Sequence, residues 1–122
     1  MSEITIYERY RLGQAYMADG DVRSAARVLE PAVEAEPTSA ALWFLLAQAY
    51  FGAARLRRAE AAFQRVVEID PTDHHARFGL GRALERQSRY GEALAQYRIA
   101  LALSPEADYL EARQRVEARL AA

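Results

Sequence analysis

Apolar side chains recur along this chain at steps of three and four residues, in segments long enough to be helices. In the middle of the chain, one stripe consists of Leu42, Leu45, Leu46, Ala49 and Tyr50, and the next of Phe63, Val66 and Val67. Side chains at these steps share one face of a helix, so the pattern predicts helices over roughly 41–51 and 56–69. No segment shows the pattern of a strand, and the chain is therefore expected to be all-α.

The same two-helix pattern repeats along the chain with a period of 34 residues. Three series recur at this interval: Leu12, Leu46 and Leu80; Ala25, Ala59 and Ala93; and Pro37, Pro71 and Pro105. A fixed period of this length is typical of stacked repeats. It predicts units over 6–39, 40–73 and 74–107 within one domain, 1–122. One helix pair cannot bury its stripe alone, so the pairs are expected to stack and to form an extended concave surface.

The residues of the second unit identify the type of repeat. Its fourth to thirty-second places include Trp43, Leu46-Ala47, Tyr50, Ala59, Phe63 and Pro71. This series resembles the tetratricopeptide repeat, whose pattern is Trp, Leu-Gly, Tyr, Ala, Phe and Pro at the same places. Arg9 and Arg77 replace the tryptophan in the other units. The resemblance covers residues 6–107 and implies a right-handed α-solenoid of three helix-turn-helix repeats.

Each unit carries signals for its ends. Thr5, Ser39 and Asp73 stand one residue ahead of each unit, where N-caps are expected. The prolines close each unit because proline cannot continue a helix interior. Residues 108–122 do not repeat the pattern and are predicted to form a capping helix that covers the third unit. The apolar face of this helix consists of Tyr109, Ala112, Val116 and Leu120.

Three further features predict packing within the units. Small residues at Gly13, Ala47 and Gly81 are expected to let paired helices approach closely. Trp43 is expected to be a buried packing residue. Pro31 falls inside the second helix of the first unit and is expected to kink it, because proline removes a helical hydrogen bond.

Composition excludes several classes of function. The net charge is -1, so no overall field favours nucleic acid or an anionic membrane. The chain has no cysteine, and all 16 basic residues are arginine. Without lysine or asparagine, phosphate-loop and Schiff-base chemistry are excluded. No apolar run reaches the length of a membrane span, and the segment Met1–Tyr10 has no signal-peptide pattern. A cytoplasmic location is therefore expected.

The candidate chemical sites are few. His74 and His75 are adjacent, and neighbours on a helix point in different directions, so they rarely hold one metal ion together. They are interpreted as surface or helix-start histidines. No acid–base pair or nucleophile constellation is visible, so no catalytic residue, cofactor or metal is expected.

The resemblance places the interaction surface on the first helix of each pair. Its groove positions would be Tyr7, Tyr10, Gln14, Phe44, Gln48, Phe51, His75, Phe78, Arg82 and Arg86. The fifth place is aromatic in every unit, as Tyr10, Phe44 and Phe78. Exposed aromatics on a groove commonly mark an interaction site. The alternative is that these rings pack between helices and complete the core.

The carboxylate clamp is the best-known ligand mode of this family, and it uses lysine and asparagine in the groove. The matching places here hold Tyr10, Gln14, Leu45, His75 and Gly79. The sequence therefore predicts that this chain does not use the clamp.

Two functions remain open at this stage. The first is a non-enzymatic interaction module that binds an extended or helical segment of another protein in an aromatic groove. The second is a structural protein that self-assembles into a homo-oligomer, since the first unit has a charge of -2 and the third of +2. Three-repeat chaperones of bacterial secretion systems resemble the chain in size, but they normally carry an N-terminal extension that this chain lacks. A partner of nucleic acid or membrane is not expected.

Overall fold

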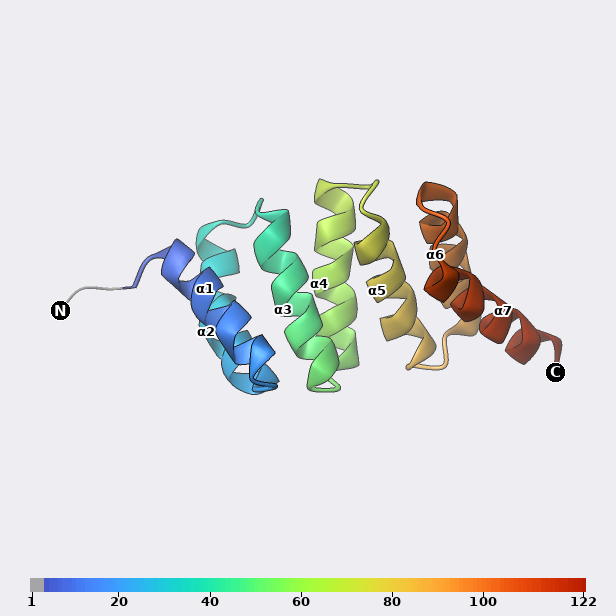
Figure 1. The fold of residues 1–122 in the computed structure, drawn as a ribbon, viewed down its shortest axis with the longest axis horizontal. Helices are drawn as coiled ribbons and strands as arrows, with labels where there is room; N and C mark the ends of the chain where they lie inside the picture. Colours follow the sequence, from blue (N-terminus) through green and yellow to red (C-terminus); the bar gives the residue numbers. More distant parts are fainter. Residues whose placement is uncertain (1–3) are drawn as a thin grey trace.

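The computed structural model describes residues 4–122, so the first three residues of the expected domain lie outside it. Within this range the chain forms seven helices and no strand. They stack side by side, with α1 and α7 at opposite ends of the row (Figure 1). The helices are α1 (Ile6–Ala18), α2 (Val22–Ala35), α3 (Ala40–Gly52), α4 (Leu56–Ile69), α5 (His74–Glu85), α6 (Tyr90–Leu103) and α7 (Ala107–Ala121). The predicted all-α solenoid is confirmed.

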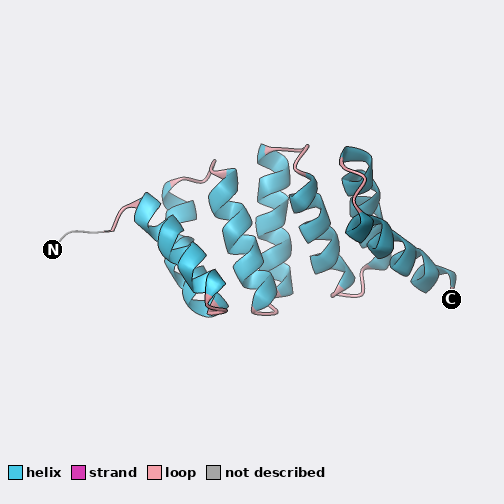
Figure 2. Cartoon of the chain, in the orientation of Figure 1, coloured by secondary structure: helices cyan, strands magenta, loops and turns pink. Residues whose placement is uncertain are grey.

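Short loops join consecutive helices (Figure 2). The loop inside each pair places one residue in the left-handed backbone region: Gly20 has a φ of 78°, Ala54 of 58° and Ser88 of 62°. These residues are 34 positions apart. At Gly20, two bonds close the end of α1: the amide of Asp21 donates to the carbonyl of Tyr16 and the amide of Gly20 to that of Met17. This bonding pattern satisfies the last carbonyls of a helix. The equivalent bonds end α3 and α5, so the same tight turn recurs in every unit.

The three predicted N-caps are confirmed. The side chain of Thr5 accepts a hydrogen bond from the amide of Glu8, and the carboxylate of Glu8 accepts one from the amide of Thr5, so both end groups are satisfied. The side chains of Ser39 and Asp73 accept from the amides of Leu42 and Ala76 and so cap α3 and α5. Pro31 lies inside α2, which runs as one helix from Val22 to Ala35.

Small residues bring the two helices of a pair close together, as predicted. A Cβ added at Gly13 would lie 2.9 Å from the side chain of Leu29, and one at Gly81 would lie 2.5 Å from Cε1 of Tyr97. Ala47 is fully buried. Among the described residues the core is apolar throughout, without a buried polar or charged side chain. Its continuity along the row explains why the pairs need one another.

Trp43 packs against the core, but the prediction that it is buried is wrong because it is half-buried. Its indole N–H donates to the carbonyl oxygen of Pro37 at 2.8 Å, and the guanidinium of Arg65 lies 5.6 Å from its ring centroid. The equivalent residue Arg77 donates from Nε to the carbonyl oxygen of Pro71 at 3.3 Å. The N–H group at this place therefore ties α3 and α5 to the preceding loop, whereas Arg9 in α1 donates from Nη1 to the carbonyl oxygen of Val28 in α2 at 3.2 Å.

The last helix covers the end of the third pair. Tyr109, Ala112 and Val116 are buried, and α7 packs on α6. Leu120, expected on the same face, is 50% exposed, so that part of the prediction is wrong. It lies one residue before the end of α7, which projects beyond the row (Figure 1).

Candidate functional site

An apolar pocket of about 290 Å³ lies between α3 and α5, with one wall from α4. The rings of Phe44 and Phe63 meet edge to face there, with centroids 5.9 Å apart. A Cβ at Gly79 would lie 2.4 Å from Cε1 of Phe63, so a side chain at this place would displace the ring. Phe51 and Phe78 line the same pocket and are half-buried. The pocket therefore offers aromatic surface to a ligand group of modest size.

A second pocket, of about 360 Å³, adjoins the first and shares Phe51 and Arg82 with it. This pocket is basic. The guanidinium of Arg82 lies 4.5 Å from the Phe51 ring centroid and that of Arg86 lies 5.2 Å from it. Arg119 reaches in from α7 and lies 5.1 Å from the ring centroid of Tyr90. Arginines held on aromatic faces are positioned while their N–H groups remain available.

The charge balance of this basic pocket depends on which arginines are already paired. Arg115 donates from Nε and Nη2 to the carboxylate of Glu85, at 2.8 Å each. Among residues 4–122, Arg82, Arg86 and Arg119 make no ion pair within 4.0 Å. The pocket therefore presents three arginines whose charge an anionic ligand can neutralise.

Glu85 lines the basic pocket and connects it to α7 through the hydrogen bonds from Arg115. It also accepts a hydrogen bond from the buried hydroxyl of Tyr97 at 2.7 Å. The hydrogen bonds from Arg115, despite partial burial, and the bond from Tyr97 hold the pKa of Glu85 below its usual range. Burial and the bond to Glu85 raise the pKa of Tyr97, so this phenol stays neutral. The network fastens α7 to both α5 and α6.

The structure brings most of the predicted groove residues together, but not all. Six line the apolar pocket: Phe44, Gln48, Phe51, His75, Phe78 and Arg82. Arg86 lines the adjoining basic pocket. Tyr7 and Tyr10 line a separate hollow of about 290 Å³ that also includes residues at the start of α3. Gln14 is exposed on α1 and lines neither the two adjoining pockets nor this hollow. The ten residues therefore do not line one pocket.

The aromatic residues of the fifth place combine the two interpretations left open by the sequence. Tyr10, Phe44 and Phe78 are half-buried, and each packs against the core with part of its ring. The ring of Phe78 lies 4.6 Å from that of Tyr109, centroid to centroid, and 5.6 Å from that of Tyr97. Phe51 also packs against the core, and the guanidinium groups of Arg82 and Arg86 lie over its ring. Phe51 is the one aromatic residue that lines both pockets.

Several pocket residues were missed from the sequence. Phe63 belongs to a second helix, and Arg115 and Arg119 belong to α7, outside the repeated pattern. The groove places that the resemblance implies all belong to the first half of each unit, so they give no signal for a pocket wall supplied by α4 or α7. The i, i+4 spacing of Arg115 and Arg119 on the expected capping helix was the one available sign.

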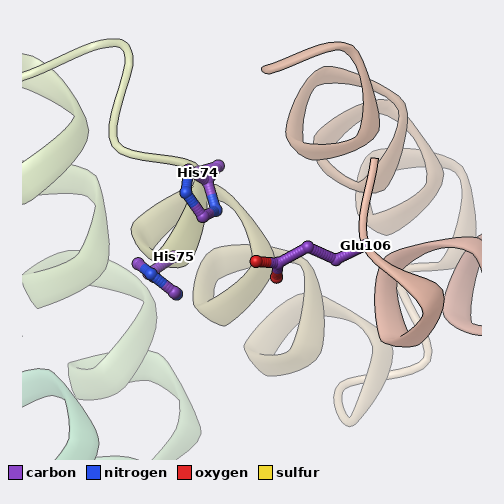
Figure 3. Close-up of side chains that lie close together, drawn as sticks. All are labelled: His74, His75 and Glu106. Atoms are coloured by element: carbon purple, nitrogen blue, oxygen red, sulfur yellow. The ribbon is translucent and has the colours of Figure 1, made fainter. Parts of the chain in front are cut away.

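The interpretation of His74 and His75 as helix-start histidines is confirmed, because they are the first two residues of α5, but the expectation that their rings point apart is wrong. Their ring centroids lie 4.2 Å from each other at the start of α5. Glu106 reaches toward them from the segment before α7 (Figure 3). The nitrogen and oxygen atoms of His74, His75 and Glu106 that could bind a metal ion all lie within 4.8 Å of one another.

Comparison with known protein families gives two matches. A tetratricopeptide repeat model matches residues 16–77, and a second model of the same description matches residues 62–95. No curated protein matches the sequence. Within residues 4–122, none of the helices combines the length and apolar character required to cross a membrane.

Solved structures share the fold over nearly the whole chain. The first TPR of Spaghetti (RPAP3), bound to the HSP90 peptide SRMEEVD, has a TM-score of 0.92 at 21% identity, covering 96% of this chain and 94% of its own. The Arabidopsis OM64 TPR domain has a TM-score of 0.87 at 24% identity, covering 91% and 93%. A structure of MamA (MSR-1) has a TM-score of 0.87 at 26% identity, covering 97% of this chain and 68% of its own.

Proposed function

Because this chain belongs to the tetratricopeptide repeat family, we propose that it is a non-enzymatic interaction module that binds a segment of another protein across its two adjoining pockets. One observation carries the proposal: an aromatic pocket and a basic pocket share Phe51 and Arg82. A bound segment can therefore fill one pocket with an apolar side chain and place its next residues against the arginines.

The chemistry of the pockets specifies the segment. A large apolar side chain, such as phenylalanine or leucine, suits the pocket between Phe44 and Phe78. Acidic residues beside it suit Arg82, Arg86 and Arg119, which lack an ion-pair partner among the described residues. Aromatic and arginine side chains dominate the binding energy of most interfaces. The expected ligand is an acidic segment with one large apolar anchor.

The peptide bound to the Spaghetti domain, SRMEEVD, is acidic as well, but this chain would hold an acidic ligand differently. It has no lysine or asparagine for the family's carboxylate clamp. One clamp position is Gly79, where Phe63 occupies the space of any side chain. The arginines used here stand instead at Arg82, Arg86 and Arg119. We therefore expect recognition of an internal acidic segment rather than of a chain terminus.

Fluorescence anisotropy with labelled peptides tests the proposal. The panel contains an acidic peptide with a central phenylalanine, the same peptide with alanine in its place, a lysine-for-glutamate version, and SRMEEVD. The first peptide is expected to bind most tightly, and added salt should weaken its binding because exposed charges are screened. The other three should bind at least about tenfold more weakly, since a lost anchor or charge contact costs about 1.4 kcal/mol or more.

Matched variants locate the binding. Phe51→Ala and Arg82→Gln should each weaken the first peptide by about tenfold or more, because each changes both pockets. Arg23→Gln, an exposed arginine on α2, removes the same charge away from the pockets and should leave affinity unchanged. Equal affinity of all four peptides, or equal loss in Arg23→Gln and Arg82→Gln, would contradict the proposal.

The charges of the end units favour a second candidate, head-to-tail association of copies. Residues 6–39 carry -2 and residues 74–107 carry +2, and opposite ends of a row can meet only in a heterologous contact. Sedimentation over a range of protein and salt concentrations separates the candidates. A mass that rises with concentration and falls with salt supports self-association, whereas a constant monomer mass leaves only the peptide-binding module.

A further inference from the structure

Two histidines and a glutamate form a cluster where the start of α5 meets the segment before α7. His74 and His75 are the first two residues of α5, and Glu106 is the residue before α7. Their ligand atoms lie within 4.8 Å of one another (Figure 3). We propose that these three side chains bind a divalent transition-metal ion of the zinc class.

Tyr109 shows how closely the two imidazoles already converge. Its hydroxyl oxygen lies 2.8 Å from Nδ1 of His74 and 3.4 Å from Nδ1 of His75. Two ring nitrogens thus face one point, and the carboxylate of Glu106 lies beside them. The phenol has one proton to donate, so it cannot satisfy all three groups as acceptors. A cation between the rings and the carboxylate would satisfy the groups that the phenol leaves without a donor.

The donor set selects the kind of ion. Two imidazole nitrogens and one carboxylate oxygen suit zinc, cobalt and nickel, whereas calcium and magnesium prefer oxygen ligands throughout. Metal–ligand bonds of about 2.0–2.2 Å require the three atoms to close in slightly from their present separation. His75 and Glu106 are exposed and can rotate to do so. Three protein ligands leave a coordination position for water or for a group of a partner.

The surroundings support an ion rather than a purely structural contact. Glu106 makes no ion pair within 4.0 Å among residues 4–122, so its charge is available to a cation. Its side chain makes no capping bond to α7 either. The hydroxyl of Tyr109 is a hydrogen-bonding neighbour of both imidazole rings and helps to orient them.

Binding of the ion would join two segments that are distant in the sequence. The ligands come from the first turn of α5 and from the loop before α7, so the ion would hold the last helix on the row. A ligand that binds only the folded state raises the melting temperature in proportion to the logarithm of its concentration. His75 also lines the apolar pocket, whereas His74 and Glu106 line neither pocket. Glu106→Gln therefore tests metal binding separately from the proposed peptide binding.

The composition leaves no other histidine or cysteine in the chain that could bind zinc. The chain has 2 histidines, both in this cluster, and no cysteine. Calorimetric titration of the whole chain with zinc alone at neutral pH is expected to show saturable binding with about one ion per chain. Thermal melting should show a rise with zinc and none with magnesium. Titration with cobalt should give the visible absorption of a nitrogen- and oxygen-ligated ion.

Variants assign the binding to these ligands. His75→Ala and Glu106→Gln should each lower zinc affinity by about tenfold or more. Both residues are exposed, so both variants are expected to keep the helical circular dichroism and the melting temperature of the metal-free chain. Glu111→Gln removes an exposed carboxylate further along α7 and should leave zinc affinity unchanged. Absence of saturable binding, or binding retained in both His75→Ala and Glu106→Gln, would overturn the proposal.

Discussion

Substituting alanine for Gly81 tests the packing that holds each helix pair together. The added Cβ would lie 2.5 Å from Cε1 and 2.7 Å from Cδ1 of Tyr97. The ring has no free space into which it can move, because Tyr97 is fully buried and its hydroxyl is bonded to Glu85 at 2.7 Å. The ring of Phe78 packs beside it. Either α5 must move away from α6, or the ring must leave its place.

Two opposing contributions determine the size of the effect. Overpacking a well-filled core costs about 1–3 kcal/mol. Replacing glycine by alanine inside a helix contributes about 0.5–1 kcal/mol in the other direction. At Gly81 the contact is with an immobile ring, so we expect the core term to exceed the helix term. The net loss should be about 1–2 kcal/mol, which lowers the melting temperature of a domain of this size by about 4–8 °C.

Gly91 provides the matched control for this substitution. It lies near the start of α6, and a Cβ added there would meet no atom within 4 Å. Gly91→Ala should therefore leave the melting temperature unchanged or raise it slightly. Thermal melting followed by circular dichroism measures both variants. In a Tyr97→Leu background the cost of Gly81→Ala should shrink, because the ring edge is gone. A melting temperature of Gly81→Ala at or above that of the wild type would contradict this prediction.

Three other predictions follow from contacts described above. Trp43→Phe keeps an aromatic ring but loses the 2.8 Å hydrogen bond to the carbonyl oxygen of Pro37. The free energy of unfolding measured in urea should therefore fall by about 1 kcal/mol. An unchanged urea midpoint would show that this hydrogen bond does not stabilise the fold. A chain ending at Pro105 lacks α7 and uncovers the flank of the third pair, so it should melt lower and associate as its concentration rises in sedimentation; a stable monomer would contradict the capping role. The pKa of Glu85 is held below its ordinary value of 4.5, so its contribution to stability is fully present above that pH and is lost as the pH falls through the lower folded pKa. Glu85→Gln should therefore flatten the fall of melting temperature in acid, and an unchanged acid profile would show that this carboxylate carries no such linkage.

The period of the sequence was sufficient to predict the helices and their starts. Thr5, Ser39 and Asp73 cap helices where the period placed them, because capping depends on side chains within three residues of the helix start. Gly13 and Gly81 could be predicted as close contacts for a related reason. A residue without a side chain, repeated on the face between two helices, leaves room that the partner helix fills.

The arrangement of the candidate site could be predicted only in part. A place in the repeat fixes the face of its own helix, which is why Phe44, Phe51 and Phe78 were found. It does not fix what stands opposite, so the separation of Tyr10 from the apolar pocket was not visible. The left-handed turn residue Ala54 was also missed, because alanine rarely adopts a positive φ. Its conformation is imposed by the turn that both helices share.

The meeting of His74, His75 and Glu106 was beyond the reach of the sequence for another physical reason. All three residues fall within the predicted unit 74–107, but Glu106 stands in its last loop, directly before α7, and the period does not predict the path of that loop. The path of that loop depends on how α7 docks, and this docking follows from tertiary packing of Tyr109 rather than from any local signal.

The row of helices has a consequence for how this chain folds and unfolds. Each helix packs chiefly on the helices before and after it, so nearly all contacts join segments close in sequence. Chains of low contact order fold fast, and linear arrays can open from one end without losing the rest. The apolar and basic pockets are built from α3 to α7 alone. Hydrogen exchange should therefore detect states in which α1 and α2 have melted while both pockets persist, so the first pair can fray without releasing a ligand.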